Sequence, residues 1–343
     1  MKKIPDLFIM AIVTKEEWIE FCKDHPDHAL LQNAEWGELK SGFGWAPVYI
    51  HVNTAGAMVL FRSLPAGLKI AYIPRGPIGH IFAPLWPEIH ALCRKKNAIF
   101  LRVEPDFWQN SPEANELEYS MEGFIPSFAT VQPPRTILVS LDGTEEDWLA
   151  RMNQKTRYNI RLSQKKDLTV EESDDASVFH DLMVTTGSRD AFGVHSEAYY
   201  RKCLDCFHEG KKGRIILVRY QGKPLSALML FIEGKRGYYL YGASSNEERN
   251  RMPNHLAQWT AMKVCKEAGC SEYDLWGIPD EDESVLEEQF QNRHDGLWPV
   301  YRFKRGFGGE VKRTMGSFDY IYSPLLYKAV KFADEQRRKR AAA

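Results

Sequence analysis

The residues with the clearest chemical potential lie in a short glycine-rich segment near the carboxyl end of the chain. Residues 300–309 read Val-Tyr-Arg-Phe-Lys-Arg-Gly-Phe-Gly-Gly, which places Phe303 and Lys304 just before three glycines. Glycine lets a backbone approach a ligand closely, and a neighbouring lysine can neutralise charge developing on an oxyanion or a phosphate. Because glycine-rich turns with lysines are also common on surfaces, the segment indicates a reaction centre only in combination with other motifs.

A second candidate is the most basic stretch of the chain, residues 152–166. Its principal cations are Lys155, Arg157, Arg161 and Lys165. On a helix the last three follow one another at intervals of four residues and form one stripe. A cationic stripe beside an aromatic side chain, here Tyr158, suits a nucleic-acid backbone. An ordinary solvated helix face explains the same composition equally well.

A third candidate joins two expected helices at residues 185–200. It gathers Arg189, Phe192, His195, Tyr199 and Tyr200. An arginine fork can bind a diphosphate, and the aromatic rings can stack on a base or a sugar. The alternative is an Arg189–Asp190 ion pair on a loop with packed aromatic side chains.

Several reaction classes lack support in the sequence. No Walker, dinucleotide-binding, HExxH or GxSxG motif occurs. A net charge of −1 argues against a general DNA-binding protein. Of the six cysteines only Cys203 and Cys206 form a CxxC pair, and no second pair completes a tetrahedral site. We therefore expect reduced, buried thiols and no metal site.

The elements that must position these residues occur twice in the same order. Each half has a helix start with a Thr cap and acidic first turn, a hairpin, a further strand, a helix, and a strand closed by proline. The hairpins are 46–62 and 214–232, the helices 84–96 and 254–268, and the last strands Ala98–Glu104 and Tyr273–Ile278. The order predicts a duplicated α/β (α+β) unit with mixed sheets and flanking helices.

We expect one domain over residues 1–145, a second over 146–323, and a basic carboxyl-terminal helix over 324–343 that can pack back on the first domain. The amino-terminal apolar run, Leu7 to Val13, is too short to span a bilayer and is expected to form a buried first strand.

Taken in order, motifs spread over nearly the whole chain resemble the Fem family (FemABX) of peptidoglycan-branching aminoacyltransferases. They are Gln32–Trp36 with Lys40, Tyr72–Pro77, Gln132-Pro133, Lys155–Ile160, Arg189–Phe192, Tyr241–Ser245, Tyr273–Pro279 and Phe303–Gly309. Each motif is weak alone, but the ordered set is specific. The chain has no long heptad stretch and so resembles the short members that lack a two-helix arm.

The resemblance implies two tandem acetyltransferase-type (GNAT) domains. It also implies transfer of an aminoacyl group from tRNA to the side-chain amine of residue three of a muropeptide. Lys304 with Phe303 would lie at the reaction centre. The acceptor would be held by Lys40, Trp36, Arg75, Arg189, His195, Tyr199 and Tyr241, and the tRNA by the basic helix.

The sequence departs from the family pattern at two positions. Glu104 stands before Pro105 where members often have Asp, and His195 stands four residues before Tyr199 where UDP-binding members have Arg. Glu104 is a candidate catalytic base or relay, although a structural carboxylate at a strand end is a slightly better explanation. Because of the second departure, the sequence does not identify which residues bind the diphosphate of the acceptor.

The expected partners are aminoacyl-tRNA and either UDP-MurNAc-pentapeptide or a lipid-linked precursor, with no cofactor and no DNA. We expect a cytoplasmic protein, with peripheral contact at the inner membrane face through the basic residues 337–340 as an option. One alternative is an acyl-CoA-dependent GNAT N-acyltransferase, but residues 249–255 lack the glycines of a pyrophosphate loop. Another is a non-catalytic binding protein of the same fold.

Overall fold

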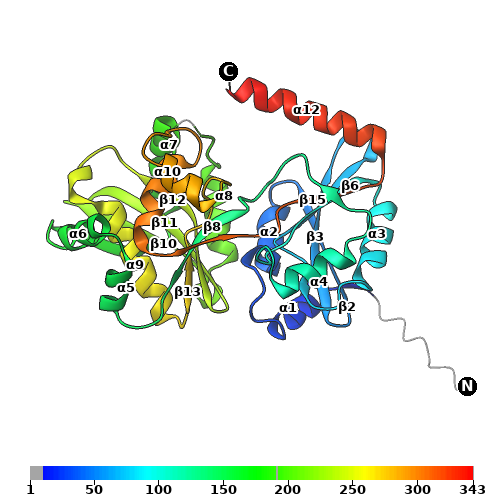
Figure 1. Ribbon diagram of the computed structural model, residues 1–343, viewed down its shortest axis with the longest axis horizontal. Coiled ribbons are helices and arrows are strands. Elements are labelled where there is room, and N and C mark those ends of the chain that lie inside the picture. The colour runs from blue at the N-terminus through cyan, green and yellow to red at the C-terminus, as the bar shows by residue number, and fades with distance from the viewer. Residues whose placement is uncertain (1–10, 191, 343) are drawn as a thin grey trace, which may run out of the picture. The chain divides into compact units, whose positions relative to one another are not determined.

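The computed structural model describes residues 11–190 and 192–342, and these divide into two compact units (Figure 1). Unit 1 holds the described residues up to Gln132 together with those from Thr314 onward. Unit 2 holds Pro133–Arg313. Each unit is built on one mixed sheet with helices on its faces.

Unit 1 contains an eight-stranded sheet in which β5 (Ile78–Gly79) pairs with β3 outside the main path. The main order is β1 (Ile12–Val13), β2 (Trp45–Val52), β3 (Ala55–Ser63), β4 (Lys69–Pro74), β6 (Ala98–Glu104), β15 (Phe318–Ile321) and β7 (Ile125–Pro126). Its α-helices are α1 (Lys15–Lys23), α2 (Ala34–Ser41), α3 (Leu85–Lys95), α4 (Pro112–Ser120) and α12 (Pro324–Ala342).

Unit 2 contains a seven-stranded sheet. Its order is β9 (Leu168–Ser173), β10 (Gly213–Tyr220), β11 (Lys223–Glu233), β12 (Arg236–Ser244), β13 (Glu272–Asp274), β8 (Arg135–Ser140) and β14 (Glu310–Arg313). Its α-helices are α5 (Glu145–Arg151), α6 (Gln154–Ser163), α7 (Ala176–Asp190), α8 (Glu197–Cys206), α9 (Pro253–Glu267), α10 (Glu283–Gln289) and α11 (Trp298–Lys304).

The two main sheet paths have the same topology. Position by position, β1, β2, β3, β4 and β6 correspond to β9, β10, β11, β12 and β13. In both sheets one parallel pair, β4–β6 or β12–β13, interrupts an otherwise antiparallel ladder. The predicted fold class, a duplicated α/β unit with mixed sheets, is therefore confirmed.

The strand after each parallel pair comes from outside the continuous repeat. In the first sheet it is β15, which pairs with β6 although more than 200 residues separate them in sequence. In the second sheet it is β8, which follows the unit 1 chain directly and pairs with β13. The expected ranges 1–145 and 146–323 differ from the two units at this point, because β8 belongs to the second sheet and β15 to the first.

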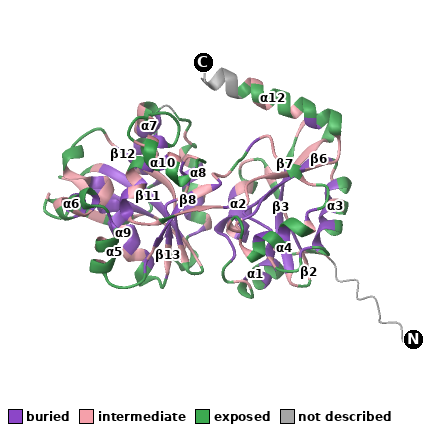
Figure 2. Ribbon diagram, in the orientation of Figure 1, coloured by how far each residue is buried: buried purple, intermediate pink, exposed green. Residues whose placement is uncertain are grey.

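Each sheet is covered by helices on both faces, so the strands are largely buried while the outer helix faces are exposed (Figure 2). In unit 2, Leu228 and Leu230 of β11 join the core that includes α9. The alternating residue Phe231 packs edge-on against Phe207, directly after α8 on the other face. This alternation is the ordinary strand period.

The two Thr residues expected to cap helices do so. Thr14 and Thr144 each accept the amide of the third helical residue, whose carboxylate accepts the Thr amide in return. Of the expected first strand, Leu7 to Met10 lie outside the described residues, and β1 keeps Ile12 about half exposed. The side chains of residues 338–340 in the basic tail are also outside the described part.

Candidate active site

Lys304 lies where the parallel pair of unit 2 ends. The pairing of β12 with β13 stops at Tyr238 and Asp274. Just beyond that point the Lys304 ammonium donates hydrogen bonds to the carbonyl oxygens of Trp276, at 3.1 Å, and Gly277, at 2.8 Å. It also lies 5.3 Å from the centre of the Tyr239 ring on β12. The ammonium therefore sits at the carboxyl end of two parallel strands that part there.

The environment of Lys304 weakens its charged form. The residue is only 5% exposed, and burial lowers the pKa of its ammonium to about 7, while the nearby Asp274 carboxylate opposes the shift. Asp274 is itself fixed, because it accepts hydrogen bonds from Thr136 and from the Trp276 amide. A lysine poised near neutrality in a buried setting can stabilise an anion or exchange a proton.

Phe303 is oriented by a histidine that the sequence did not single out. The His255 ring meets Phe303 edge-on at 5.2 Å and lies more nearly parallel to Phe307 at 6.1 Å. Its Nε2 is 3.2 Å from the Asn159 amide nitrogen on α6. Burial lowers the pKa of His255 to about 4, with Lys155 adding to the effect. His255 is therefore neutral near pH 7 and accepts from Asn159.

The three glycines after Lys304 are explained by packing within the protein. Gly308 has φ +74°, and a Cβ there would lie 2.2 Å from the Arg151 carbonyl oxygen. A Cβ on Gly306 would lie 2.1 Å from Thr156 Oγ1, and one on Gly309 would press on the Leu138 backbone. We expected these glycines to admit a ligand. In the structure they let the turn carrying Lys304 lie tightly on its own chain.

A second group of expected site residues comes together at the carboxyl end of β12. The His195 ring stacks on Tyr199 at 3.9 Å, and the Tyr199 and Tyr241 hydroxyls are 3.1 Å apart. His195 is exposed and Tyr199 is buried. Burial raises the pKa of both tyrosines, so both hydroxyls stay protonated and can donate hydrogen bonds. The sequence placed these three residues in one site, and the structure brings them into one cluster.

Arg189 reaches the same strand end from α7. Its guanidinium forms a two-point ion pair with the neighbouring Asp190, at 2.9 Å for both contacts. It also donates to the Ser244 carbonyl oxygen and to the Asn246 side chain. The Arg–Asp pair weighed as the structural alternative is therefore present, and it ties α7 to the end of β12.

The basic stretch is divided by Asn153, which caps α6. Lys155, Arg161 and Lys165 are exposed. Arg157 instead donates to the carbonyl oxygens of Leu149, Ala150 and Met152 at the end of α5. Arg157 thus caps a helix, while Lys155 and Arg161 on α6 and Lys165 just beyond its end are exposed.

In unit 1 the expected acceptor residues fall on α2 and on the turn after β4. Trp36 is buried, and Lys40 lies over its ring at 5.0 Å. Arg75 has φ +50°, is 5% exposed and donates to Thr314 Oγ1, with Asp106 3.6 Å away. Arg75 therefore fastens the chain entering β15 to the turn after β4.

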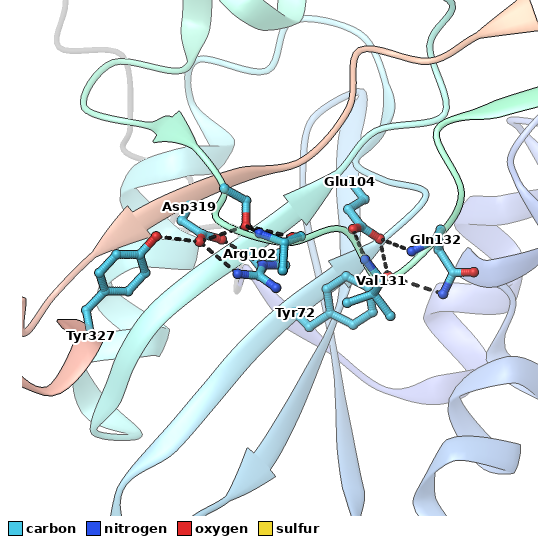
Figure 3. A network of polar contacts seen from close by, with 9 residues as sticks. Tyr72, Arg102, Glu104, Val131, Gln132, Asp319 and Tyr327 are labelled. Carbon is cyan, nitrogen blue, oxygen red and sulfur yellow. Dashed lines mark hydrogen bonds and ion pairs between the residues drawn. The ribbon is translucent and has the colours of Figure 1, made fainter. Parts of the chain in front are cut away.

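Glu104 ends β6 inside a set of hydrogen-bond donors (Figure 3). Its carboxylate accepts from the Tyr72 hydroxyl at 2.6 Å and from the amides of Val131 at 2.5 Å and Gln132 at 2.9 Å. Only 3% of the residue is exposed. This geometry is that of a structural carboxylate, which pins the segment leaving unit 1 to its sheet.

Three further properties bear on cofactors and partners. Among the described residues, no group of three or more His, Cys, Asp or Glu is placed to hold a metal ion. Within the same part of the chain, no helix combines the length and hydrophobicity needed to cross a membrane. The first turn of α9 has Pro253 in place of an amide donor and contains no glycine. It does not offer the backbone cradle of an acyl-CoA pyrophosphate.

Comparison with known proteins decides the family. The FemAB family profile matches residues 13–221 and 216–335. The chain belongs to the FemAB family. It is a transferase, and the resemblance drawn from the ordered motifs is confirmed.

FemAB relatives match over almost their full length. The chain is 25% identical to a lipid II:glycine glycyltransferase of Staphylococcus haemolyticus, covering 93% of this chain and 94% of the relative. It is 26% identical to one from Staphylococcus aureus with the same coverage. These alignments run over 406 and 408 positions, more than the 343 residues here, so the relatives carry insertions that this shorter FemAB chain lacks.

Solved structures agree with the fold. The crystal structure of FemX superposes with a TM-score of 0.81 at 24% identity, covering 93% of this chain and 98% of FemX. A tandem GNAT protein from the clavulanic acid biosynthesis pathway superposes with a TM-score of 0.53 at 11% identity, covering 92% and 98%. The expected tandem GNAT architecture is thereby confirmed for this FemAB protein.

Sequence reasoning missed the surroundings of Lys304. The Trp276 and Gly277 carbonyls lie inside a recognised motif, but a sequence shows no carbonyl direction. Trp276 adopts φ +59°, which is uncommon for a large side chain. The pairing of Asn159 with His255 joins positions 96 residues apart and leaves no local signal.

Proposed function

We propose that this FemAB protein transfers an amino acid from aminoacyl-tRNA to the side-chain amine of residue three in the stem peptide of a peptidoglycan precursor. Family membership and the printed activity of the glycyltransferase relatives support the reaction class. The observation that carries the proposal is the buried Lys304 ammonium at the carboxyl end of the parallel pair in unit 2.

The reaction needs no external energy source, because an ester is exchanged for an amide. The acceptor amine loses a proton and attacks the ester carbonyl carbon, giving a tetrahedral oxyanion. The carbon–oxygen bond to the terminal ribose then breaks, the ribose hydroxyl takes up a proton, and the amide remains. The enzyme must hold the two reactants in line and stabilise the negative charge.

Lys304 is suited to the charge-stabilising step. Two carbonyl oxygens fix its ammonium, so little reorganisation is needed when an oxyanion forms nearby. With a pKa of about 7 it can also give its proton to the departing ribose oxygen. Phe303, held by His255, would shape the adjoining surface for the terminal nucleotide.

Acceptor contacts are proposed for each unit by itself. In unit 1, we propose that Lys40 and Arg75 contact acceptor phosphates or peptide, with Trp36 supporting the Lys40 ammonium. In unit 2, Arg189 would face acceptor phosphate and Tyr241 would position the peptide beside Tyr199 and His195. His195 stands where UDP-binding members of the family have an arginine. We therefore propose that this protein contacts the acceptor diphosphate through other residues, while the His195 ring offers a stacking surface.

The exposed cations on α6 and just beyond its end would contact the tRNA. Lys155, Arg161 and Lys165 are exposed beside Tyr158, which is 63% exposed. Phosphate neutralisation by such a surface releases counterions, so binding should weaken steeply with salt. Arg157 is left out of this surface because it caps α5.

The deciding experiment is a transfer assay with the purified chain, a mixture of charged tRNAs and an acceptor, read by mass spectrometry. We expect one amino-acid mass on the stem peptide of UDP-MurNAc-pentapeptide or its lipid-linked counterpart, and none after ribonuclease treatment. The added mass names the donor. Failure with both acceptors, together with acetyl-CoA turnover on a small amine, would replace the proposal with an ordinary GNAT acyltransferase.

A further inference from the structure

Helix α12 keeps an apolar face in solvent although its other face is anchored. Leu325 is 81% exposed and Phe332 is 62% exposed. They stand seven residues apart, so they lie on one side of the helix, two turns from each other. Exposed Ala329 and Lys328 occupy the positions between them. We name Leu325, Lys328, Ala329 and Phe332 the outer face of α12.

The opposite side of α12 is fixed to unit 1. The Tyr327 hydroxyl donates to Asp319 Oδ2 (Figure 3), and the two oxygen atoms lie 2.8 Å apart. Its ring packs edge-on against Phe100 at 5.3 Å and Phe128 at 5.5 Å. Val330, three residues on, packs against the same cluster. The helix cannot rotate to bury Leu325 and Phe332 against unit 1 without losing these contacts.

We propose that the outer face of α12 docks on an anionic lipid surface. Leucine and phenylalanine on one helix face, with lysines beside them, are the composition of a helix that lies in a membrane interface. Lys328 can extend its ammonium toward headgroups while its stem lies along the apolar stripe. The sequence continues with two acidic residues, Asp334 and Glu335, and then four basic residues at 337–340, so the net positive charge complements anionic headgroups.

The composition of the outer face favours lipid over the other candidate partners. An RNA backbone is bound by cations and stacking rings, whereas Leu325, the most exposed apolar residue of the face, can do neither. A second copy of this helix is a poorer partner, because pairing two α12 helices would bring the lysines Lys328 and Lys331 of one copy close to those of the other, and like charges repel.

Docking here deepens the proposed function, because it would bring the transferase to a lipid-linked acceptor. It is argued from α12 alone and requires no step of the transfer reaction.

The test is vesicle flotation of the full-length chain. We expect the protein to float with phosphatidylcholine vesicles that contain phosphatidylglycerol and not with phosphatidylcholine alone, and to be released by salt. The double change Leu325→Gln with Phe332→Gln should weaken binding about tenfold or more. Both side chains are exposed, so the thermal midpoint should not change. The matched control is Tyr119→Gln, because Tyr119 is an aromatic of α4 that is 95% exposed, and it should bind as the parent does.

Equal flotation of the double variant and the parent would overturn the proposal. So would parental flotation on uncharged vesicles, or a dimer of the parent that the double change dissociates. If the double variant lost tRNA affinity by as large a factor as it lost vesicle affinity, the proposal would be overturned in favour of an RNA-binding surface. Vesicle binding needs no substrate, so failure of amino-acid transfer would leave this result intact. Retained transfer to the UDP-linked acceptor by a variant that no longer floats would separate the two claims.

Discussion

At the scale of single residues, Lys304 carries the strongest expectation. Replacing it with Ala removes the fixed ammonium, and loss of one preorganised donor to an oxyanion costs on the order of 100-fold to 1,000-fold in kcat. The measurement is the transfer rate at saturating substrates. Lys312→Ala is the matched control, because that lysine forms an ion pair with the exposed Glu310. A Lys304→Ala enzyme as fast as the control would remove Lys304 from the reaction centre.

The same lysine should make stability depend on pH. Its pKa is about 7 in the folded chain and ordinarily 10.5. Between these values the unfolded chain binds the additional proton, so the free energy of unfolding should rise with pH from about 7 to about 10.5. Urea unfolding of the parent and of Lys304→Met over this range isolates the effect as the difference in slope. Identical slopes would mean that Lys304 titrates normally.

Glu104 tests whether a buried carboxylate is structural or catalytic. The change Glu104→Gln puts an amide donor against the Val131 or Gln132 amide, so the free energy of unfolding should fall by about 1–3 kcal/mol. Urea unfolding and transfer rates are measured together. Unchanged stability with a collapsed kcat would instead identify Glu104 as the base, which the sequence left open.

At the scale of elements, α5 and α6 show why a charge pattern is an incomplete guide. Arg157 and Arg161 are equivalent on a helical projection, yet only Arg157 caps α5. We expect Arg157→Ala to lower the free energy of unfolding by about 1–2 kcal/mol. Arg161→Ala should leave the free energy of unfolding unchanged. It should weaken tRNA binding and lower the slope of the binding constant against salt concentration, on logarithmic scales, by about one. Equal stability of the two variants would contradict the capping role.

Elements with local signals were predictable. The hairpin 214–232 became β10 and β11 around a turn at Gln221-Gly222, and the strand Ala98–Glu104 has those bounds in the structure. The environment of Lys304 was not predictable, because backbone carbonyls and the left-handed Trp276 have no sequence signature. The pairing of Phe318–Ile321 with β6 was not predictable for another reason, because the two strands lie far apart in sequence.

At the scale of the whole molecule, the closing strand of unit 1 depends on one buried ion pair. Arg102 forms two bonds with Asp319 of β15, at 2.8 and 2.9 Å, and Asp319 is fully buried. Asp319→Ala strands a buried guanidinium and should cost about 3–5 kcal/mol of unfolding free energy. Urea unfolding and protease sensitivity after residue 313 measure it. Glu310→Ala, which breaks an exposed pair, is the control and should cost about 0–1 kcal/mol.

The return of β15 to the first sheet sets an order of events on the ribosome. β6 is made early, but the strand that covers its edge emerges only after all of unit 2 has been synthesised. At ordinary rates of translation, roughly 10–40 seconds pass between residues 104 and 318. During that interval the edge of β6 that β15 will cover is unpaired in the nascent chain, and Arg102 has not yet formed its ion pair with Asp319. A truncated message would therefore yield a chain that lacks β15, and the unpaired edge of β6 in its amino-terminal half would be a binding site for chaperones.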